Sequence, residues 1–304
     1  YFPPADRNPN YDITKYPQRW QNFKQYTFNQ IEELMSDYGP VNILWLDGGW
    51  VRPKTAQELE KVRFKNNQDI DMAGISAMAR KHQPGILVVD RDVPGKNQNY
   101  LTPEQSIPDS LLPYPWETCM TAATSWSWVK NDQYKSSKQL VQTLITVVSR
   151  GGNLLLNIAP DANGKWDDTA YARLEEIGEW MKVNGVAIYN TQPMVPWQSG
   201  PFAFTRNKNK IYAFYLSSNH SETLPHTFSL PFANSTIKKV TLLGADDITL
   251  SHKPLGNNTE FRLPDAYNAP LSLESVIEIE CEELRFFCVP LAKPRVGLFV
   301  ANPR

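Results

Sequence analysis

The sequence has 304 residues, of which 41% are hydrophobic and 12% aromatic, a composition typical of a globular protein with a sizeable core. The net charge of −1 gives no electrostatic basis for binding nucleic acid or an anionic membrane surface. There is no apolar run of about 18 residues, so no membrane span is predicted. The three cysteines and four histidines show no metal-ligand spacing, so neither a metal nor a cofactor is predicted.

The first hundred residues or so alternate between helical and strand-like segments. Apolar residues at helical spacing predict a helix over 17–38, which a Gly-Pro pair ends. The apolar run 41–46 predicts a buried strand. Residues 56–81 predict a helix in two pieces, and 86–89 predict a second strand. A helix between two such strands is typical of a parallel α/β sheet.

The same alternation continues after a long segment, 91–115, that is rich in proline. Long ordered loops in compact domains are usually functional. Beyond it we expect a strand over 116–121, an amphipathic helix over 134–149 and a strand over 153–158. A further helix is predicted over 168–184, where a glycine ends it.

The pattern changes near residue 195, where short alternating segments separated by turn residues begin. Such segments predict an all-β sandwich over 196–304. Residues 281–304 do not alternate cleanly and carry no prediction of their own. The expected strands are 202–206, 211–216, 226–230, 238–243, 260–263 and 276–280.

The repeated strand–helix units predict that residues 1–195 form part of a (β/α)8 TIM barrel. A closed barrel takes about 250 residues, and fewer than that precede the sandwich. Tyr1 and Phe2 resemble the end of a strand that begins earlier. We therefore expect the N-terminal strands of the barrel to lie outside this sequence.

Acidic residues near strand ends are the candidates for chemistry. Asp47 directly follows the strand 41–46 and has tryptophans on both sides, an arrangement that suits a sugar. The alternative is that Asp47 caps a helix. Two carboxylates facing one bond would give glycoside hydrolysis, but the pattern alone does not choose the pair. The other acidic candidates are Asp90, Asp92, Glu104 and Glu117.

Several stretches resemble the retaining α-L-fucosidases of glycoside hydrolase family 29. The matching motifs extend, in order, over about residues 1–195. They are the Y-G-P and W-x-D-G pair at 38–40 and 45–48, the D-R element at 90–91, T-P-E at 102–104 with W-E at 116–117, S-W at 125–126, the G-G-N-L-L-L-N-I-A-P run at 151–160, and the I-G … N-G … I-Y run at 177–189.

The resemblance implies Asp47 as the nucleophile and Glu104 as the general acid/base, with Glu117 as a rival because alignments in this loop can slip. It also implies a fucose pocket lined by Trp45, Arg91, Trp126 and Tyr1. The histidines with which the family holds fucose hydroxyls would precede Tyr1. The sequence departs from the family at Leu46, Asp90 and Trp128.

The expected function is that of a retaining α-L-fucosidase acting on fucosylated oligosaccharides or glycoconjugates. The alternatives are a related barrel glycosidase of different sugar specificity and a sugar-binding relative without activity. The resemblance implies a periplasmic, secreted or lysosomal location. Fucosyl linkage, aglycone and oligomeric state have no signal in the sequence.

Overall fold

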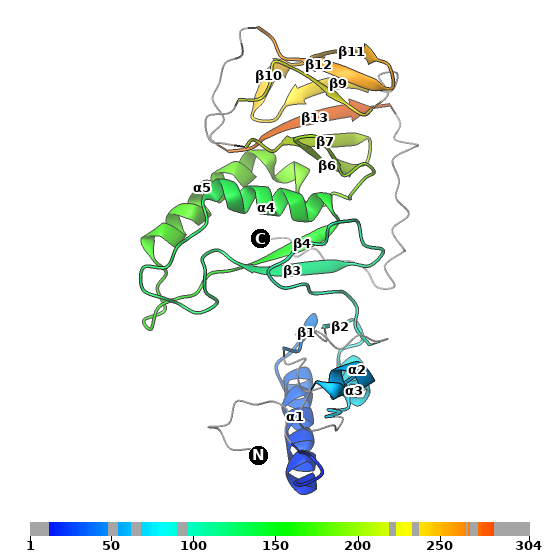
Figure 1. Ribbon diagram of the computed structural model, residues 1–304, viewed down its shortest axis with the longest axis vertical. Helices are drawn as coiled ribbons and strands as arrows, with labels where there is room; N and C mark the ends of the chain where they lie inside the picture. The colour runs from blue at the N-terminus through cyan, green and yellow to red at the C-terminus, as the bar shows by residue number, and fades with distance from the viewer. Residues whose placement is uncertain are drawn as a thin grey trace. The chain divides into compact units, whose positions relative to one another are not determined.

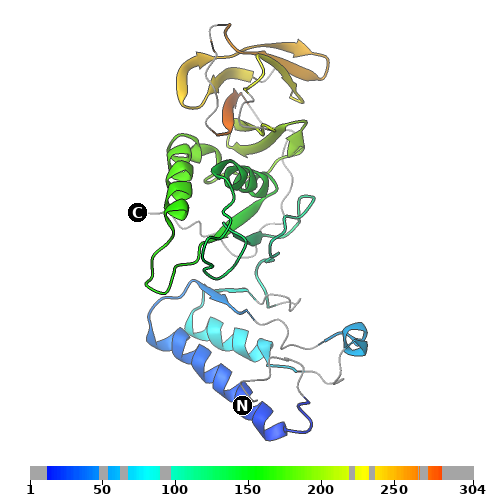
Figure 2. The ribbon, with the colours of Figure 1, turned by 60° about the vertical axis from the view of Figure 1, so that its left-hand side comes forward.

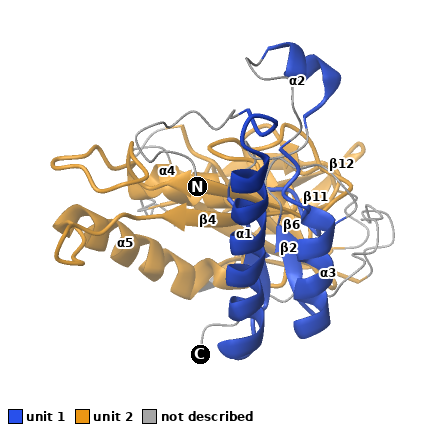
Figure 3. Ribbon diagram, turned by 90° about the horizontal axis from the view of Figure 1, so that it is seen from below, with its two compact units in different colours: residues 1–102, 295–297 blue, residues 103–294, 298–304 orange. Residues whose placement is uncertain are grey.

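The computed structural model shows two compact units built from α/β and antiparallel β segments (Figure 1; Figure 2 gives a second view). Unit 1 comprises residues 1–102 and 295–297, and unit 2 comprises 103–294 and 298–304 (Figure 3). The residues that the structure describes are 12–47, 54–61, 68–89, 97–218, 223–232, 237–265, 267 and 273–282. Each unit is a body of its own.

Unit 1 is a β-α-β arrangement with one long helix beside it. Its two strands pair in parallel, with Ile43 opposite Leu87, as the apolar runs predicted. The predicted helix in two pieces is confirmed, although residues 62–67 between the pieces lie outside the described part. In order, the elements are α1 (Pro17–Asp37), β1 (Ile43–Trp45), α2 (Ala56–Glu60), α3 (Met72–His82) and β2 (Leu87–Val89).

One side chain, Gln83, fastens the elements of unit 1 together at the end of α3. Its Nε2 donates to the carbonyl oxygens of Met35 at 2.6 Å and Gly39 at 3.0 Å, and its Oε1 accepts from the backbone N of Val41 at 3.4 Å. Gly39, at φ +84°, ends α1 in the left-handed region. A core of residues from α1, α3 and both strands, among them Ile75 and Val88, holds the strands in place.

The first part of unit 2 is a second β-α-β arrangement. Strands β3 (Trp116–Thr121) and β4 (Gly152–Asn157) pair in parallel, with α4 (Ser137–Ser149) as the connection. Helix α4 begins three residues later than predicted, because Ser136 and Gln139 form a capping box. Helix α5 (Asp168–Asn184) follows β4 and ends in a short 3-10 turn, η1 (Gly185–Ala187).

The rest of unit 2 is antiparallel. One sheet has the strand order β10-β9-β13-β7-β6-β5 and the other β11-β12-β8. All six predicted strands are confirmed, and β5, β10 and β11 are additional. Their bounds are β5 (Gln198–Ser199), β6 (Phe202–Asn207), β7 (Lys210–Tyr215), β8 (Thr227–Leu230), β9 (Ile237–Leu242), β10 (Ala245–Thr249), β11 (Ser251–Leu255), β12 (Asn258–Arg262) and β13 (Ser275–Cys281).

The central strands of the six-stranded sheet are buried on both faces. Along β7, Ile211, Ala213 and Tyr215 contribute to the core of the antiparallel part. The alternate residues Tyr212 and Phe214 belong to a separate core with α4 and α5. Both views show the two helices lying against β6 and β7 (Figure 1, Figure 2).

This second core explains why the compact units divide after Thr102 and not near residue 195. The change from parallel to antiparallel strands does fall near 195, between η1 and β5. The division into a catalytic part, 1–195, and a sandwich, 196–304, stays a prediction. The described parallel strands form two separate pairs, and the closed barrel likewise stays a prediction. Among the described helices, none combines the length and the apolar character that a membrane span requires.

Candidate active site

Asp47 lies just beyond the carboxyl end of β1 and is exposed. The backbone N of Leu46 donates to the carbonyl of Val89 at 2.9 Å, so the pairing with β2 holds the chain up to the residue before Asp47. The next described helix, α2, is capped by Thr55 and Glu58, not by Asp47. The carboxylate therefore stands at the edge of a parallel strand pair, where α/β proteins usually carry their chemistry.

Trp45 is half-buried beside Tyr100, at a centroid distance of 6.5 Å and an interplanar angle of 75°. Asn99 brings this tyrosine to the strands. Its backbone N donates to the carbonyl of Val88 at 2.9 Å, and its Oδ1 accepts from the backbone N of Val88 at 2.8 Å and from Arg80 Nη2 at 3.2 Å. Two aromatic rings thus lie together at the end of β1, where the chain leads to Asp47.

Glu104 lies beside β3, on a short stretch of chain that runs parallel to the strand. It forms a β-bridge with Cys119. The backbone N of Gln105 donates to the carbonyl of Cys119 at 2.9 Å, and the backbone N of Cys119 donates to the carbonyl of Pro103 at 3.3 Å. Gln105 Nε2 also donates to Thr121 Oγ1 at 3.1 Å. Glu104 is therefore an exposed carboxylate on a backbone fixed to the sheet.

Glu117 is the second residue of β3 and is half-buried, opposite Asn153 of β4. Burial raises the pKa of its carboxyl group above the ordinary value. A raised pKa suits a group that must begin a reaction protonated. Glu104 lies beside β3, opposite Cys119, and is therefore nearer than Glu117 to the carboxyl end of the strand. The geometry therefore keeps both carboxylates as candidates for the acid/base.

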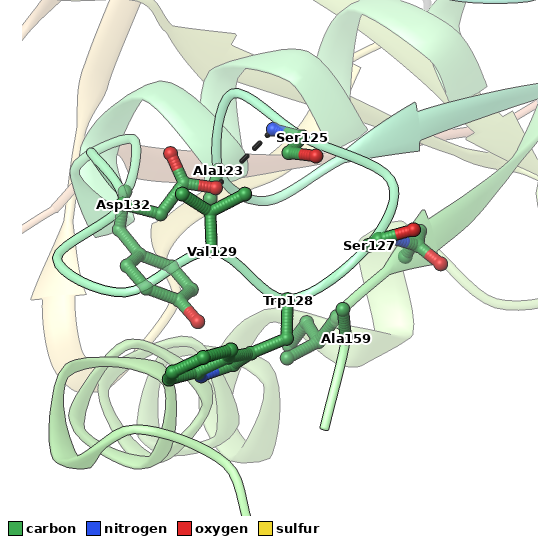
Figure 4. Close-up of a pocket in the computed structure, with 10 residues that line it drawn as sticks. Ala123, Ser125, Ser127, Trp128, Val129, Asp132 and Ala159 are labelled. Atoms are coloured by element: carbon green, nitrogen blue, oxygen red, sulfur yellow. Dashed lines mark hydrogen bonds between the residues drawn. The ribbon is translucent and has the colours of Figure 1, made fainter. Parts of the chain in front are cut away.

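Asp132 organises the loop 122–136, which follows β3 (Figure 4). Trp126 belongs to this loop. Its carboxylate accepts from the backbone N of Thr124 at 3.3 Å, Ser125 at 3.2 Å and Gln133 at 2.7 Å, and also from Thr124 Oγ1. The hydrogen bond from Thr124, followed by those from the backbone, lowers the pKa of Asp132. The ionised carboxylate holds the loop in one conformation.

Lys135 supports the same loop from its far end. Its backbone N donates to the carbonyl of Ala122 at 2.9 Å, and its Nζ donates to the carbonyls of Thr121 and Ala123. Burial lowers the pKa of the Lys135 amine. The two ends of the loop are thus tied together close to the end of β3.

Two tryptophans of this loop are held by the last residue of β4 and by a residue of the loop that follows it. Nδ2 of Asn157 donates to the carbonyl of Trp126 at 3.0 Å, and Nε1 of Trp128 donates to Oδ1 of Asp167 at 3.3 Å. Both indoles remain partly exposed, Trp126 at 41%. The cavity under the loop has a volume of about 10 Å³, room for about one water molecule. The loop is therefore packed, and its tryptophans face outward.

The predicted site residues fall into three groups. Trp45 and Asp47 lie at the end of β1 in unit 1. In unit 2, Glu104 lies beside β3, Glu117 lies on it and Trp126 follows it. Tyr1 and Arg91, and the neighbouring Asp90 and Asp92, lie outside the described residues. Within the described part of the chain, no group of three His, Cys, Asp or Glu side chains could hold a metal ion.

Sequence reasoning missed Asp132, Asn157 and Asp167. Asn157 had a signal, since it is a polar residue at the end of an apolar strand. Asp132 and Asp167 had none, because their partners in the loop are recognised only in three dimensions.

Comparison with known proteins decides the family. The α-L-fucosidase family matches residues 2–186, which is more than half of the chain. The chain belongs to the α-L-fucosidase family. The matched range includes β1 to β4 with Asp47, Glu104 and Glu117, and it ends just before the antiparallel strands.

Relatives with established names are α-L-fucosidases. The chain is 33% identical to the human plasma α-L-fucosidase in an alignment 209 positions long, which covers 62% of this chain and 41% of that protein. It is 28% identical to the human tissue α-L-fucosidase in an alignment 232 positions long, which covers 72% of this chain and 46% of that protein. The chain therefore spans less than half the length of these relatives.

Solved structures agree in fold. Isoenzyme 1 of the Paenibacillus thiaminolyticus α-L-fucosidase superimposes with a TM-score of 0.72 at 25% identity, over 92% of this chain and 65% of that one. A GH29 α-L-fucosidase from Bacteroides thetaiotaomicron gives a TM-score of 0.73 over 92% of this chain at 20% identity, which shows the fold alone.

Proposed function

We propose that the protein releases terminal α-L-fucose from fucosylated oligosaccharides or glycoconjugates by a double displacement with net retention. The observation that carries the proposal is the family match over residues 2–186, because it includes an exposed carboxylate, Asp47, just beyond the carboxyl end of the parallel strand β1. The related plasma and tissue enzymes are named α-L-fucosidases.

In the first step, Asp47 attacks the anomeric carbon of fucose and forms a glycosyl ester, while the bond to the leaving oxygen breaks. Glu104 gives its proton to that oxygen. In the second step, Glu104 takes a proton from water, whose oxygen attacks the anomeric carbon and releases Asp47. Two inversions give retention, and each residue returns to its starting state.

The local structure supports these roles. Asp47 follows a strand whose pairing persists to Leu46, so its carboxylate stands on a fixed backbone. The bridge to Cys119 fixes the backbone of Glu104 in the same way. Fixed backbone positions lower the entropic cost of bringing a catalytic group to the reacting bond. In this proposal Trp45, Trp126, Arg91 and Tyr1 line the fucose pocket.

Azide chemistry tests the assignment in the full-length protein. In Asp47→Ala, turnover of an aryl α-L-fucoside should be lost, and azide in the place of the missing carboxylate should give the β-fucosyl azide. In Glu104→Ala, azide should attack the glycosyl ester and give the α-fucosyl azide. Wild-type turnover by Asp47→Ala would refute the nucleophile. Formation of the α-azide by Glu117→Ala alone would transfer the acid/base role to Glu117.

The same assays separate this function from the other readings. The departures at Leu46 and Trp128 bear on the fit of the sugar, so a panel of aryl glycosides tests a different specificity. Turnover of another glycoside in preference to the α-L-fucoside would establish a related glycosidase. Binding of fucose without turnover would establish a sugar-binding relative.

We also propose an extracytoplasmic location, namely periplasmic, secreted or lysosomal, since the relatives include a plasma enzyme. Cell fractionation of the full-length protein tests this part of the proposal, and recovery in the cytoplasmic fraction would refute it.

A further inference from the structure

Three exposed aromatic side chains gather where the chain leaves β3 and β4 in unit 2. Trp128 lies in the loop after β3 and is 38% exposed. Trp166 lies at the end of the loop after β4 and is 37% exposed, and Tyr171 lies in the first turns of α5 and is 52% exposed. We call these three residues the aromatic shelf.

Asp167 joins the members of the shelf. Its Oδ1 accepts from Trp128 Nε1 and its Oδ2 from the Tyr134 hydroxyl, both at 3.3 Å. Trp166 is the preceding residue, and its ring centroid lies 5.5 Å from that of Tyr171. In Figure 4 the indole of Trp128 extends from the loop away from the carboxylate of Asp132.

The use of Asp167 is unusual for its position. It is the N-cap residue of α5, where an aspartate side chain normally accepts from the backbone of the first helical turn. Here the side chain makes no capping hydrogen bond, and its two oxygens hold an indole and a phenol of the other loop. The side chain of Asp167 therefore positions rings of the shelf instead of capping the helix.

Part of the shelf has a purely structural explanation. Trp166 and Tyr171 occupy the positions before the cap and in the second turn, where apolar residues often pack as a hydrophobic staple. A staple accounts for the contact between these two rings. It does not account for the hydrogen bond that adds Trp128 from a different loop, nor for the exposure of all three rings.

Within unit 2, the shelf shares a loop with a predicted pocket residue. Trp126 and Trp128 lie in the same loop, and Gln105, next to the proposed acid/base Glu104, donates to Thr121, the residue of β3 that precedes that loop. The loops that follow the carboxyl ends of parallel strands are where α/β enzymes bind their substrates. Flat apolar rings edged by a hydrogen-bonding carboxylate suit a neutral pyranose, whose C–H face stacks on an aromatic ring.

We propose that the aromatic shelf binds the sugar to which the fucose is attached, a neutral pyranose. The proposal rests on the proposed fucosidase function and names the aglycone subsite of that site.

The test compares two substrates of the full-length protein. Fucosyl fluoride has no aglycone sugar, whereas disaccharides of fucose with galactose or N-acetylglucosamine have one. For Trp128→Ala and Tyr171→Ala, the ratio of kcat/KM for the disaccharide to that for the fluoride should fall by about tenfold. Trp128→Phe keeps an aromatic face and should retain most of the ratio. Tyr189→Ala, which removes a ring of similar exposure (48%) beyond the other end of α5, is the matched control.

An unchanged ratio in both Trp128→Ala and Tyr171→Ala would overturn the shelf, and so would an equal change in Tyr189→Ala. Incomplete folding of a variant lowers the rates for both substrates equally and does not change their ratio. Melting temperatures are measured alongside to show which variants fold incompletely. Failure of the wild-type protein to hydrolyse fucosyl fluoride would instead refute the proposed function. In that case, calorimetric binding of the disaccharide that weakens about tenfold in Trp128→Ala would still support the shelf, and undiminished binding would overturn it.

Discussion

Replacing Glu274 by alanine should destabilise unit 2 more than any surface change, because its carboxylate is completely buried. The carboxylate accepts from the backbone N of Ser217 at 3.1 Å, from Ser217 Oγ at 3.0 Å and from Gln142 Nε2. Lys138 Nζ lies 3.9 Å away, and the Glu274 carbonyl accepts from Trp180 Nε1 at 2.8 Å. The residue thus joins α4, α5 and the ends of β7 and β13.

The expected loss in the free energy of unfolding follows from what the change leaves behind. Truncation of one partner of a buried ion pair costs about 3–5 kcal/mol, because the other charge stays buried without compensation. The donors of Ser217 and Gln142 lose an acceptor as well, which places Glu274→Ala toward the upper end of that range. For a domain of this size such a loss lowers Tm by about 10 °C.

Thermal unfolding followed by circular dichroism measures the effect. Glu282→Ala is the matched control, since Glu282 and Lys238 form an ion pair at 4.0 Å whose side chains are 67% and 52% exposed. That change should cost less than about 1 kcal/mol. Adding Lys138→Met to Glu274→Ala should recover part of the loss, because it removes the stranded charge. A Tm of Glu274→Ala equal to that of Glu282→Ala would refute the reasoning.

Three further changes test other parts of unit 2. Burial raises the pKa of Glu117, so the folded protein binds the Glu117 proton more tightly than the unfolded chain does. This proton binding stabilises the fold at pH values below the unfolded pKa. The stabilisation is lost as the pH rises through the folded pKa. The stability of Glu117→Gln relative to wild type should therefore increase between about pH 4 and pH 7 in urea unfolding, and a constant difference would contradict this. Gly152→Ala should lower the free energy of unfolding by about 1–3 kcal/mol, because the new Cβ would lie 2.4 Å from the buried Trp116 ring. Gly178→Ala is the control and should not destabilise the protein, because the space at its Cβ is open. Equal melting temperatures of the two variants would show that Trp116 moves aside. Asp132→Ala should speed hydrogen exchange of the amides in loop 122–136, and unchanged exchange would show that other contacts hold the loop.

The elements that the sequence predicted are those whose apolar residues repeat in a regular pattern. The apolar runs gave β1, β3 and β4, and helical spacing gave α1 and α5. Strands β10 and β11 were missed because they lie at sheet edges. Their sequences contain Asp246 and Pro254, residues that edge strands tolerate and that weaken the strand pattern.

The residues of the candidate site could likewise be predicted only where a local sequence pattern marks them. Asp47 was visible because it directly follows the apolar run 41–46, and in the structure it lies two residues beyond Trp45, the last residue of β1. The hydrogen bond from Trp128 to Asp167 joins residues 39 positions apart, and no local pattern announces such a pair. The start of α4 was misplaced by three residues, since the capping box at Ser136 and Gln139 outweighs the helical character of the residues before it.

Because β7 is buried on both faces, the antiparallel strands cannot be exchanged by recombination as a separate module. A strand whose alternate residues fill two cores cannot be exchanged alone, since Tyr212 and Phe214 are shaped to the helices while Ile211 and Ala213 are shaped to the opposite layer. Dividing the protein near residue 195, where the antiparallel strands begin, would expose a hydrophobic surface on both fragments. Recombination that swaps accessory modules between glycosidases would therefore have to carry α4, α5 and the antiparallel strands together.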